Sequence, residues 1–273
     1  MHKLKGFIKY ILWSILPKKN GGTVLKVRNG PAKGVKLNLD LRKEGSYWLG
    51  NYDQWIFDSI SFSELIKKGD VVWDAGAYVG YYTGVFRKLV GDTGNVVTFE
   101  ASTTNYNRLK HLPSINKWDN VSIHYLAVGP DHSRISFVDS LGGSNGPYAL
   151  DKVYNEKDKT KITTVEVECC GVDELVYEKN IPAPDFIKFD LESAEVYALH
   201  NGDRLFKEKR PTILLELHGE QAKNAAGLFL EKYNYKALTV GSFKNGSPAF
   251  KSLDEFNKIV QGVPHMIVCQ PLN

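Results

Sequence analysis

Residues 71–83 read VVWDAGAYVGYYT, and residues 96–100 read VVTFE. In each stretch a short apolar run ends in an acid, and a turn of small residues and then a helical pattern follow the first acid. The segment therefore predicts a strand, a turn, a helix and a second strand. In an open α/β sheet, ligands bind at the carboxyl ends of the strands. We expect a ligand site beside the two acids, Asp74 and Glu100.

The turn after Asp74 indicates the kind of ligand. Its glycines let the backbone approach a ligand closely, and Glu100 is placed to accept hydrogen bonds from both hydroxyls of a ribose. A dinucleotide fingerprint needs a glycine two positions before Gly76, but Asp74 stands there and its charge would repel a pyrophosphate. A carboxylate suits the ammonium and sulfonium groups of S-adenosylmethionine, which is the predicted cofactor. A βαβ crossover without a ligand is the alternative.

The composition is that of an ordinary soluble protein. The 273 residues, 42% hydrophobic and 24% charged, allow one sizeable core and an extension. The net charge of +4 comes without a basic stripe interleaved with aromatic residues, so we predict no nucleic acid partner. Cys169, Cys170 and Cys269 have neither disulfide-framework nor metal-ligand spacing. We therefore expect free cysteines, a reducing and hence cytoplasmic location, and no metal site.

The first 16 residues, MHKLKGFIKYILWSIL, combine lysines with apolar residues. The apolar stretch is too short to span a bilayer, and no small-residue cleavage site follows it. Two interpretations stay open. The segment is either a helix that lies on an anionic membrane surface, at the inner face of the membrane, or a helix that packs on the domain or on a sister subunit of a homo-oligomer.

Strand and helix patterns alternate from residue 51 to residue 273, which predicts one domain built on a doubly wound α/β sheet. Residues 1–50 are expected to form an extension, a helix plus a small hairpin made of residues 23–28 and 35–39. Within the domain we expect one helix over residues 53–67.

The middle of the domain is expected to depart from the regular alternation of strands and helices. Residues 121–128 are expected to form one strand, and residues 134–138 and 163–169 alternate and predict an antiparallel excursion. The glycine-rich and charged insertion near 139–162 is expected to be either a substrate lid or disordered.

Polar groups end four of the expected strands: Asp74, Glu100, Asp190 with Glu192, and Glu216 with His218. Parallel strands bring these groups to one edge of the sheet, where unpaired carboxylates are costly to bury without a ligand or a task. Each group alone also has a structural interpretation, such as a helix start, a lysine partner or a satisfied core histidine. Their occurrence at four strand ends favours a functional site.

These residues resemble the FkbM family of S-adenosylmethionine-dependent methyltransferases. The similarity covers about residues 50–240 and rests on DAGAYVGYYT (74–83), VVTFEAS (96–102), PDFIKFDLESAE (184–195) and TILLELHG (212–219). It implies a seven-stranded class I methyltransferase fold, which is Rossmann-like. It also implies O-methylation of a hydroxyl on a sugar, glycan, polyketide or other natural product.

The resemblance also implies roles for individual residues. Those expected to bind the cofactor are Asp74, Gly76, Ala77, Tyr78, Gly80, Glu100, Ala101, Ala127 and Asp190, and those expected at the methyl-acceptor site are His218, Asp190, Glu192 and Glu216. The sequence departs from the family at two positions. The family usually carries glycine where Ser193 stands and commonly asparagine where Tyr78 stands.

Methyl transfer to a hydroxyl requires alignment of the acceptor and removal of its proton. His218 has a suitable intrinsic pKa for a general base, and Asp190 is the rival. The alternatives for the whole chain are a non-catalytic or N-methylating member of the same fold, and a Rossmann-type NAD-dependent oxidoreductase. Asp74 in place of the first glycine argues against the oxidoreductase, and the absence of an Asp-Pro-Pro-Tyr motif argues against N-methylation.

Overall fold

The computed structural model describes residues 22–139 and 164–273. The expected N-terminal helix and nearly all of the expected lid lie outside these ranges, and so does the question of membrane or subunit contact through residues 1–16. Within the described residues, no helix is both long enough and apolar enough to cross a membrane.

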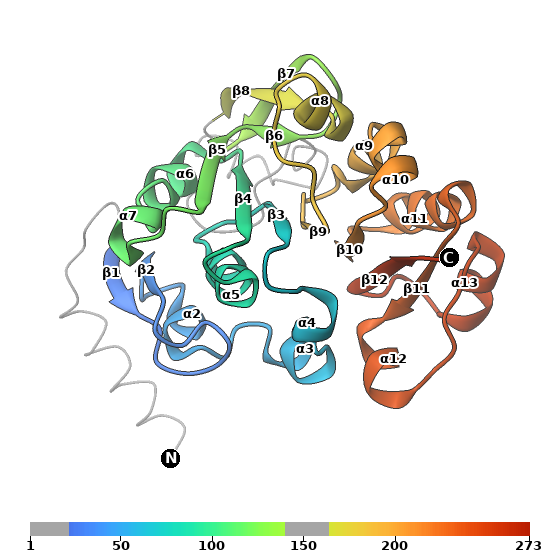
Figure 1. The fold of residues 1–273 in the computed structure, drawn as a ribbon, viewed down its shortest axis with the longest axis horizontal. Helices are drawn as coiled ribbons and strands as arrows, with labels where there is room; N and C mark the ends of the chain where they lie inside the picture. Colours follow the sequence, from blue (N-terminus) through green and yellow to red (C-terminus); the bar gives the residue numbers. More distant parts are fainter. Residues whose placement is uncertain (1–21, 140–163) are drawn as a thin grey trace, which may run out of the picture.

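A seven-stranded sheet forms the centre of the molecule, with the strand order β11-β12-β10-β9-β3-β4-β5 (Figure 1). The strands are β3 (Val71–Ala75), β4 (Asn95–Glu100), β5 (Val121–Tyr125), β9 (Phe186–Phe189), β10 (Thr212–Glu216), β11 (Tyr235–Thr239) and β12 (Met266–Pro271). Strand β12 runs antiparallel to both of its neighbours, and the pairs from β10 to β5 are parallel. The sheet confirms the predicted seven-stranded α/β fold.

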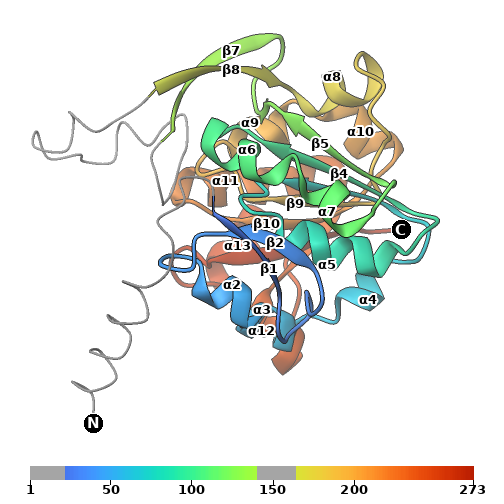
Figure 2. The same cartoon turned by 90° about the vertical axis from the view of Figure 1, so that its left-hand side faces the viewer.

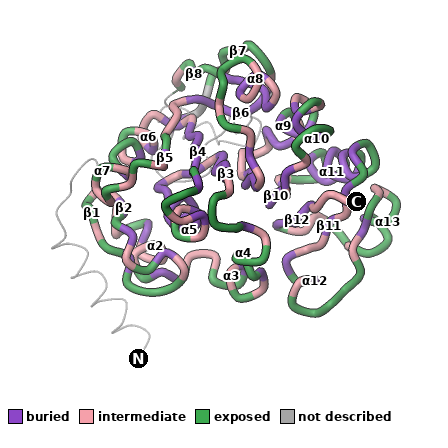
Figure 3. Tube along the Cα trace, viewed as in Figure 1, coloured by how far each residue is buried: buried purple, intermediate pink, exposed green. Residues whose placement is uncertain are grey.

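Helices cover both faces of this sheet (Figure 2). One face packs on α8 (Val172–Tyr177), α9 (Glu195–His200), α10 (Asp203–Glu208), α11 (Glu220–Tyr233) and α13 (Leu253–Ile259), and the other on α3 (Gln54–Ser59), α4 (Phe62–Leu65), α5 (Tyr81–Val90) and α12 (Val240–Asn245). Successive residues of a strand point to opposite faces, so Val72 packs on the second group of helices and Trp73 on the first. Figure 3 shows the central strands buried between these layers.

Two smaller sheets flank the central one. Strands β1 (Thr23–Lys26) and β2 (Lys36–Leu39) form the antiparallel hairpin that the sequence predicts. The hairpin packs on α6 (Thr103–Leu109) and α7 (Leu112–Asn116), while α2 (Gly45–Leu49) precedes the domain. Strands β7 (Ser133–Val138) and β8 (Thr164–Cys170) pair antiparallel, which confirms the expected excursion, and β6 (Ala127–Val128) joins them parallel to β8.

Two expected elements were wrong in their extent. The expected helix over 53–67 is interrupted because Ile60 has extended backbone, which lets both Ile60 and Phe62 enter the same core cluster. The expected strand over 121–128 ends at Tyr125. Beyond it, Ala127 and Val128 leave the central sheet and pair with Cys169 and Cys170 of β8. In both cases packing between distant segments outweighs the local pattern.

Candidate active site

A cavity of about 330 Å³ opens at the carboxyl edge of the sheet. Its walls come from α2 and the residues before it, the turn after β3, the end of β4, the segment after β5 and the loop after β9. Of the residues expected at the site, those that line it are Gly76, Tyr78, Glu100, Ala101, Ala127, Asp190 and Glu192. Its size falls in the range of cofactor and small-molecule sites.

The turn after β3 lies directly against the end of β9. Gly76 has φ of +80°, and a Cβ at this position would lie 1.8 Å from the carbonyl oxygen of Asp190. Only glycine permits this approach, because the neighbouring atom is backbone and cannot move aside cheaply. The turn and the β9 loop therefore meet at one wall of the cavity.

Glu100 presents a buried carboxylate to the cavity. Its side chain is 6% exposed, and its oxygens accept hydrogen bonds from the backbone N–H groups of Tyr78 at 2.7 Å and Ser102 at 2.8 Å. Burial raises the pKa of Glu100 to about 7, although both N–H groups act in the opposite direction. Oε1 also accepts a hydrogen bond from the side-chain amide of Asn105 at 3.5 Å, so Oε2 keeps a lone pair with which Glu100 can accept a hydrogen bond from a ligand hydroxyl.

Tyr78 connects this turn to the segment before α2. Its backbone is left-handed, with φ of +54°, and its hydroxyl donates to Oε1 of Glu44 at 2.5 Å. Glu44 is buried, and both of its carboxylate oxygens accept hydrogen bonds from one nitrogen of Arg108, at 2.8 and 2.9 Å. Sequence reasoning missed Glu44, because its partners lie on other elements and no pattern in its own segment marks it.

Asp74 lies beneath the turn and does not line the cavity. It is fully buried, accepts a hydrogen bond from the Thr83 hydroxyl at 2.6 Å, and lies 3.7 Å from the Lys188 ammonium. Burial raises the pKa of Asp74. Its contact with a cofactor stays a prediction. Ala77, Gly80, Glu216 and His218 are likewise outside the cavity lining.

Lys188 is a buried cation that sequence reasoning also missed. Its ammonium lies 3.0 Å from Asp190 and donates to the carbonyl of Gly76 at 3.2 Å. Burial by itself would lower the pKa of Lys188, but the charges of Asp190 and Asp74 raise it above its usual value. Burial likewise would raise the pKa of Asp190, but Lys188 outweighs burial and lowers it. A lysine inside the otherwise apolar strand β9 was the available signal.

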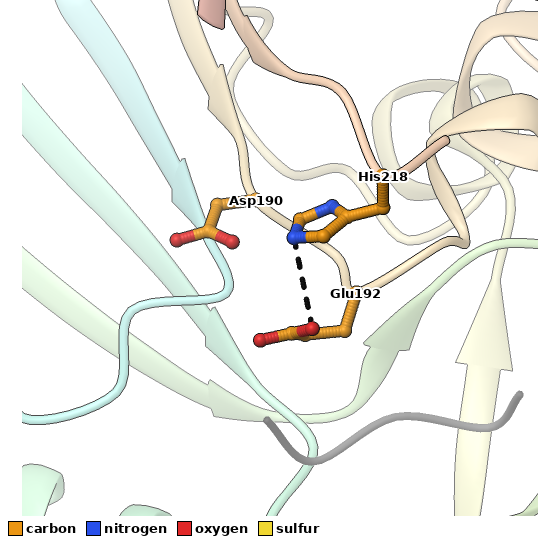
Figure 4. Close-up of side chains that lie close together, drawn as sticks. All are labelled: Asp190, Glu192 and His218. Carbon is orange, nitrogen blue, oxygen red and sulfur yellow. Dashed lines mark ion pairs between the residues drawn. The ribbon is translucent and has the colours of Figure 1, made fainter. Parts of the chain in front are cut away.

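His218 follows β10 and lies among three carboxylates, of which Figure 4 shows Glu192. Its Nδ1 is 2.8 Å from Glu195, and its Nε2 is 3.6 Å from Glu192 and 3.5 Å from Glu216. Burial would lower the pKa of His218, but the hydrogen bond to Glu195 and the surrounding carboxylates raise it to about 9. For Glu216, burial and the charge of Asp190 raise the pKa to about 8.

Glu195 is the buried partner of His218. It is fully buried and accepts hydrogen bonds from the backbone N–H groups of Leu191 and Ser193, at 2.8 and 3.3 Å. The sequence indicated only a favourable acid in the first turn of a helix. The structure adds a contact to His218 that links the loop after β9 to the end of β10.

The loop after β9 is strained at two successive residues. Glu192 and Ser193 have φ of +51° and +87°, a region that side chains other than glycine and asparagine rarely adopt. Ser193 and Tyr78 are the two positions at which the sequence departs from the family pattern, and both are left-handed. Glycine and asparagine adopt this conformation at a lower energetic cost than serine and tyrosine.

Comparisons with known proteins agree with the motifs. The family model described as Methyltransferase FkbM domain matches residues 74–237. A hexuronic acid methyltransferase, AglP of Haloferax volcanii, is 24% identical over 169 residues, which are 62% of this chain and 64% of that protein. The chain thus spans less than two thirds of the length of this curated relative.

Solved methyltransferase structures match the chain with low sequence identity and low TM-scores. The FkbM methyltransferase of Methylobacillus flagellatus KT has a TM-score of 0.45 and 15% identity, over 78% of this chain and 47% of that chain. TYW2 of M. jannaschii, in complex with AdoMet, has a TM-score of 0.46 and 15% identity, over 94% of this chain and 88% of that chain.

Proposed function

The chain belongs to the FkbM methyltransferase family, and from this premise we propose that it transfers a methyl group from S-adenosylmethionine to a hydroxyl of a sugar or glycan. The observation that carries the proposal is the cavity itself. One of its walls holds the buried carboxylate of Glu100 beside the Gly76 turn, and another holds Asp190 and Glu192. A ribose-binding acid and an acceptor-facing pair of acids thus share one cavity.

The described residues fit this cofactor. Glu100 lines the cavity with a lone pair of Oε2 available to a ribose hydroxyl, and Gly76 lines the same wall without a side chain that would fill the space. Ala127 adds a small side chain at the wall after β5, where an adenine ring needs room. When bound, S-adenosylmethionine supplies the electrophilic methyl group.

The acceptor side must orient a hydroxyl and remove its proton. Asp190 and Glu192 line the cavity, whereas His218 is outside the lining and 3.6 Å from Glu192. A hydroxyl that enters the cavity therefore contacts the carboxylates before it contacts the imidazole. Asp190 or Glu192 would accept the proton of the acceptor hydroxyl, while the cofactor, held by Glu100 and the Gly76 turn, would supply the methyl group. Lys188 and His218 hold the carboxylates in position.

Two observations favour a sugar or glycan acceptor. Carboxylates accept hydrogen bonds from hydroxyls, which are the dominant groups of a carbohydrate. The relative from Haloferax volcanii bears a name that specifies hexuronic acid. A hexuronic acid residue of a glycan is therefore the first acceptor to test.

Calorimetric titration with S-adenosylhomocysteine tests the cofactor. We expect binding to the full chain, weakened about tenfold to a hundredfold in Glu100→Ala because charged hydrogen bonds contribute about 1.5–3 kcal/mol. Glu64→Ala, an exposed acid on α4, is the matched control and should bind like the wild type. Binding of NAD without binding of S-adenosylhomocysteine would reject the proposal.

Radiolabelled S-adenosylmethionine, incubated with uronic acids, neutral sugars and glycan extracts, tests the reaction. Label in a sugar hydroxyl supports the proposal. Label on an amine would indicate N-methylation instead. Cofactor binding without transfer to any member of a broad panel would favour a non-catalytic scaffold.

A further inference from the structure

Two carboxylates that line the cavity, Asp190 and Glu192, lie close to the imidazole of His218, which stands just outside the lining (Figure 4). Asp190, Glu192 and His218 each offer one ligand atom, and these atoms all lie within 4.8 Å of one another. Asp190 and Glu192 come from the loop after β9, and His218 follows β10. Two carboxylates and an imidazole form a mixed oxygen and nitrogen donor set of the kind that divalent metals use.

The spacing is close to that of a coordination sphere. Opposite ligands of a small octahedral cation lie about 4.2 Å apart, twice the bond length of about 2.1 Å. The side chains are 23%, 28% and 15% exposed for Asp190, Glu192 and His218, so they are not locked into the core. Binding of one ion would draw the three atoms together through side-chain rotation, which their partial exposure allows.

Glu195 gives a second and independent indication of a ligand. It is fully buried, its Oε1 holds Nδ1 of His218 at 2.8 Å, and its Oε2 has no hydrogen-bond partner. A histidine that binds a metal almost always donates its other ring N–H to a carboxylate or carbonyl, which fixes the ring and its tautomer. Glu195 thus directs the opposite nitrogen, Nε2, toward the ligand group.

The charge around this nitrogen also favours a cation. Nε2 of His218 faces the carboxylates of Glu192 and Glu216, at 3.6 and 3.5 Å. The ammonium of Lys188 lies 3.0 Å from the carboxylate of Asp190, so its positive charge offsets Asp190 more than it offsets the two glutamates. Several carboxylates that converge in a partly buried place repel one another unless positive charge offsets them, and a divalent cation supplies more of that charge than Lys188 or a protonated His218.

We propose that Asp190, Glu192 and His218 bind a divalent cation of the Mn²⁺ class at the acceptor end of the cavity. Carboxylates suit Mg²⁺ and Mn²⁺, and the imidazole extends the preference to first-row transition metals. The sequence alone predicted no metal site, because the ligands come from the ends of two different strands. The cation would bind the acceptor hydroxyl and lower its pKa; this role rests on the proposed function, whereas cation binding does not.

Titration of Mn²⁺ alone into the full chain tests the site, with calorimetry for stoichiometry and electron paramagnetic resonance for the free ion. We expect one ion per chain. Glu192→Gln and His218→Ala should each weaken binding at least tenfold. Asp254→Asn is the control, because Asp254 is an exposed acid on α13 that pairs with Lys258. It should bind Mn²⁺ like the wild type.

Titration of the same samples with S-adenosylhomocysteine separates the two proposals. Variants that keep its affinity are folded, so their loss of Mn²⁺ supports the site. Glu192→Gln is nearly isosteric and partly exposed, and it decides the matter if His218→Ala does not fold. Binding of S-adenosylhomocysteine without saturable Mn²⁺ binding, or equal Mn²⁺ binding by wild type and Glu192→Gln, overturns the cation site and leaves the methyltransferase proposal standing. Mn²⁺ binding without S-adenosylhomocysteine binding would support the cation site and overturn the methyltransferase proposal.

Discussion

The two ends of the cavity hold their carboxylates in different ways. At the β4 end, Glu100 accepts hydrogen bonds from the backbone N–H groups of Tyr78 and Ser102 and, at 3.5 Å, from the side-chain amide of Asn105. At the β9 and β10 end, Asp190 pairs with Lys188, which lies two residues earlier on β9, and Glu192 pairs with His218, which follows β10. The first end relies mainly on backbone donors, which among substitutions only proline removes, whereas the second end depends on each side chain in turn.

This difference sets the sensitivity of each end to mutation. A backbone donor stays in place when its own side chain changes, so the environment of Glu100 is robust. Removal of one partner from the β9 and β10 end leaves a buried charge uncompensated, and the cost falls on several neighbours at once.

His218→Ala and Asp190→Asn should lower turnover by a factor on the order of a hundred to ten thousand, the usual cost of losing a group that assists proton removal. The affinity for S-adenosylhomocysteine should change only a few fold, because neither change touches the Glu100 end. Initial rates with radiolabelled cofactor and calorimetry give the two quantities. A rate within a few fold of wild type, or loss of cofactor binding, would remove the functional distinction between the ends.

Lys188→Met should lower the free energy of unfolding by about 3–5 kcal/mol, since it leaves Asp190 and Asp74 without their buried cation. Urea denaturation followed by circular dichroism measures the change. Lys207→Met, an exposed lysine on α10, is the matched control and should stay within about 0.5 kcal/mol. Equal stability of the two variants would mean that the acceptor end does not depend on its charged partner.

The affinity for S-adenosylhomocysteine should rise about tenfold from pH 6 to pH 8. Burial has raised the pKa of Glu100 to about 7, and ribose hydroxyls donate to the ionised carboxylate. Binding therefore releases a proton below pH 7, and affinity increases as pH passes upward through the pKa and then levels off. Calorimetry in buffers of different ionisation enthalpy counts the proton. A profile for Glu100→Gln as steep as that of the wild type would assign the dependence to another group.

Ser193→Gly should raise stability by up to about 1 kcal/mol, which corresponds to about 2–4 °C in Tm. Glycine relieves the left-handed φ of +87° and loses part of that gain through the entropy of the unfolded chain. Ser122→Gly, in the extended strand β5, should destabilise instead. Calorimetric melting compares the two variants, and a lower Tm for Ser193→Gly would show that its conformation is not strained.

Most of the fold could be predicted from local patterns. The alternation and the Gly76 turn predicted β3, α5 and β4, and apolar runs predicted β9 and β10, because each of these signals lies within one element. The extents of the elements near Ile60 and Tyr125 could not be predicted in this way. There the chain changes direction to meet segments far along the sequence.

The candidate site likewise has features that local patterns predict and features that depend on contacts between distant segments. The sequence by itself determined that acids stand at four strand ends and that Glu100 belongs to the cavity, since parallel strands bring their carboxyl ends to one edge. Only the tertiary structure decided that Asp74 lies beneath the turn, that Lys188 joins it to Asp190, and that Glu195 orients His218. A strand end is fixed by local backbone geometry, whereas the partner of a buried charge is fixed by which elements pack together.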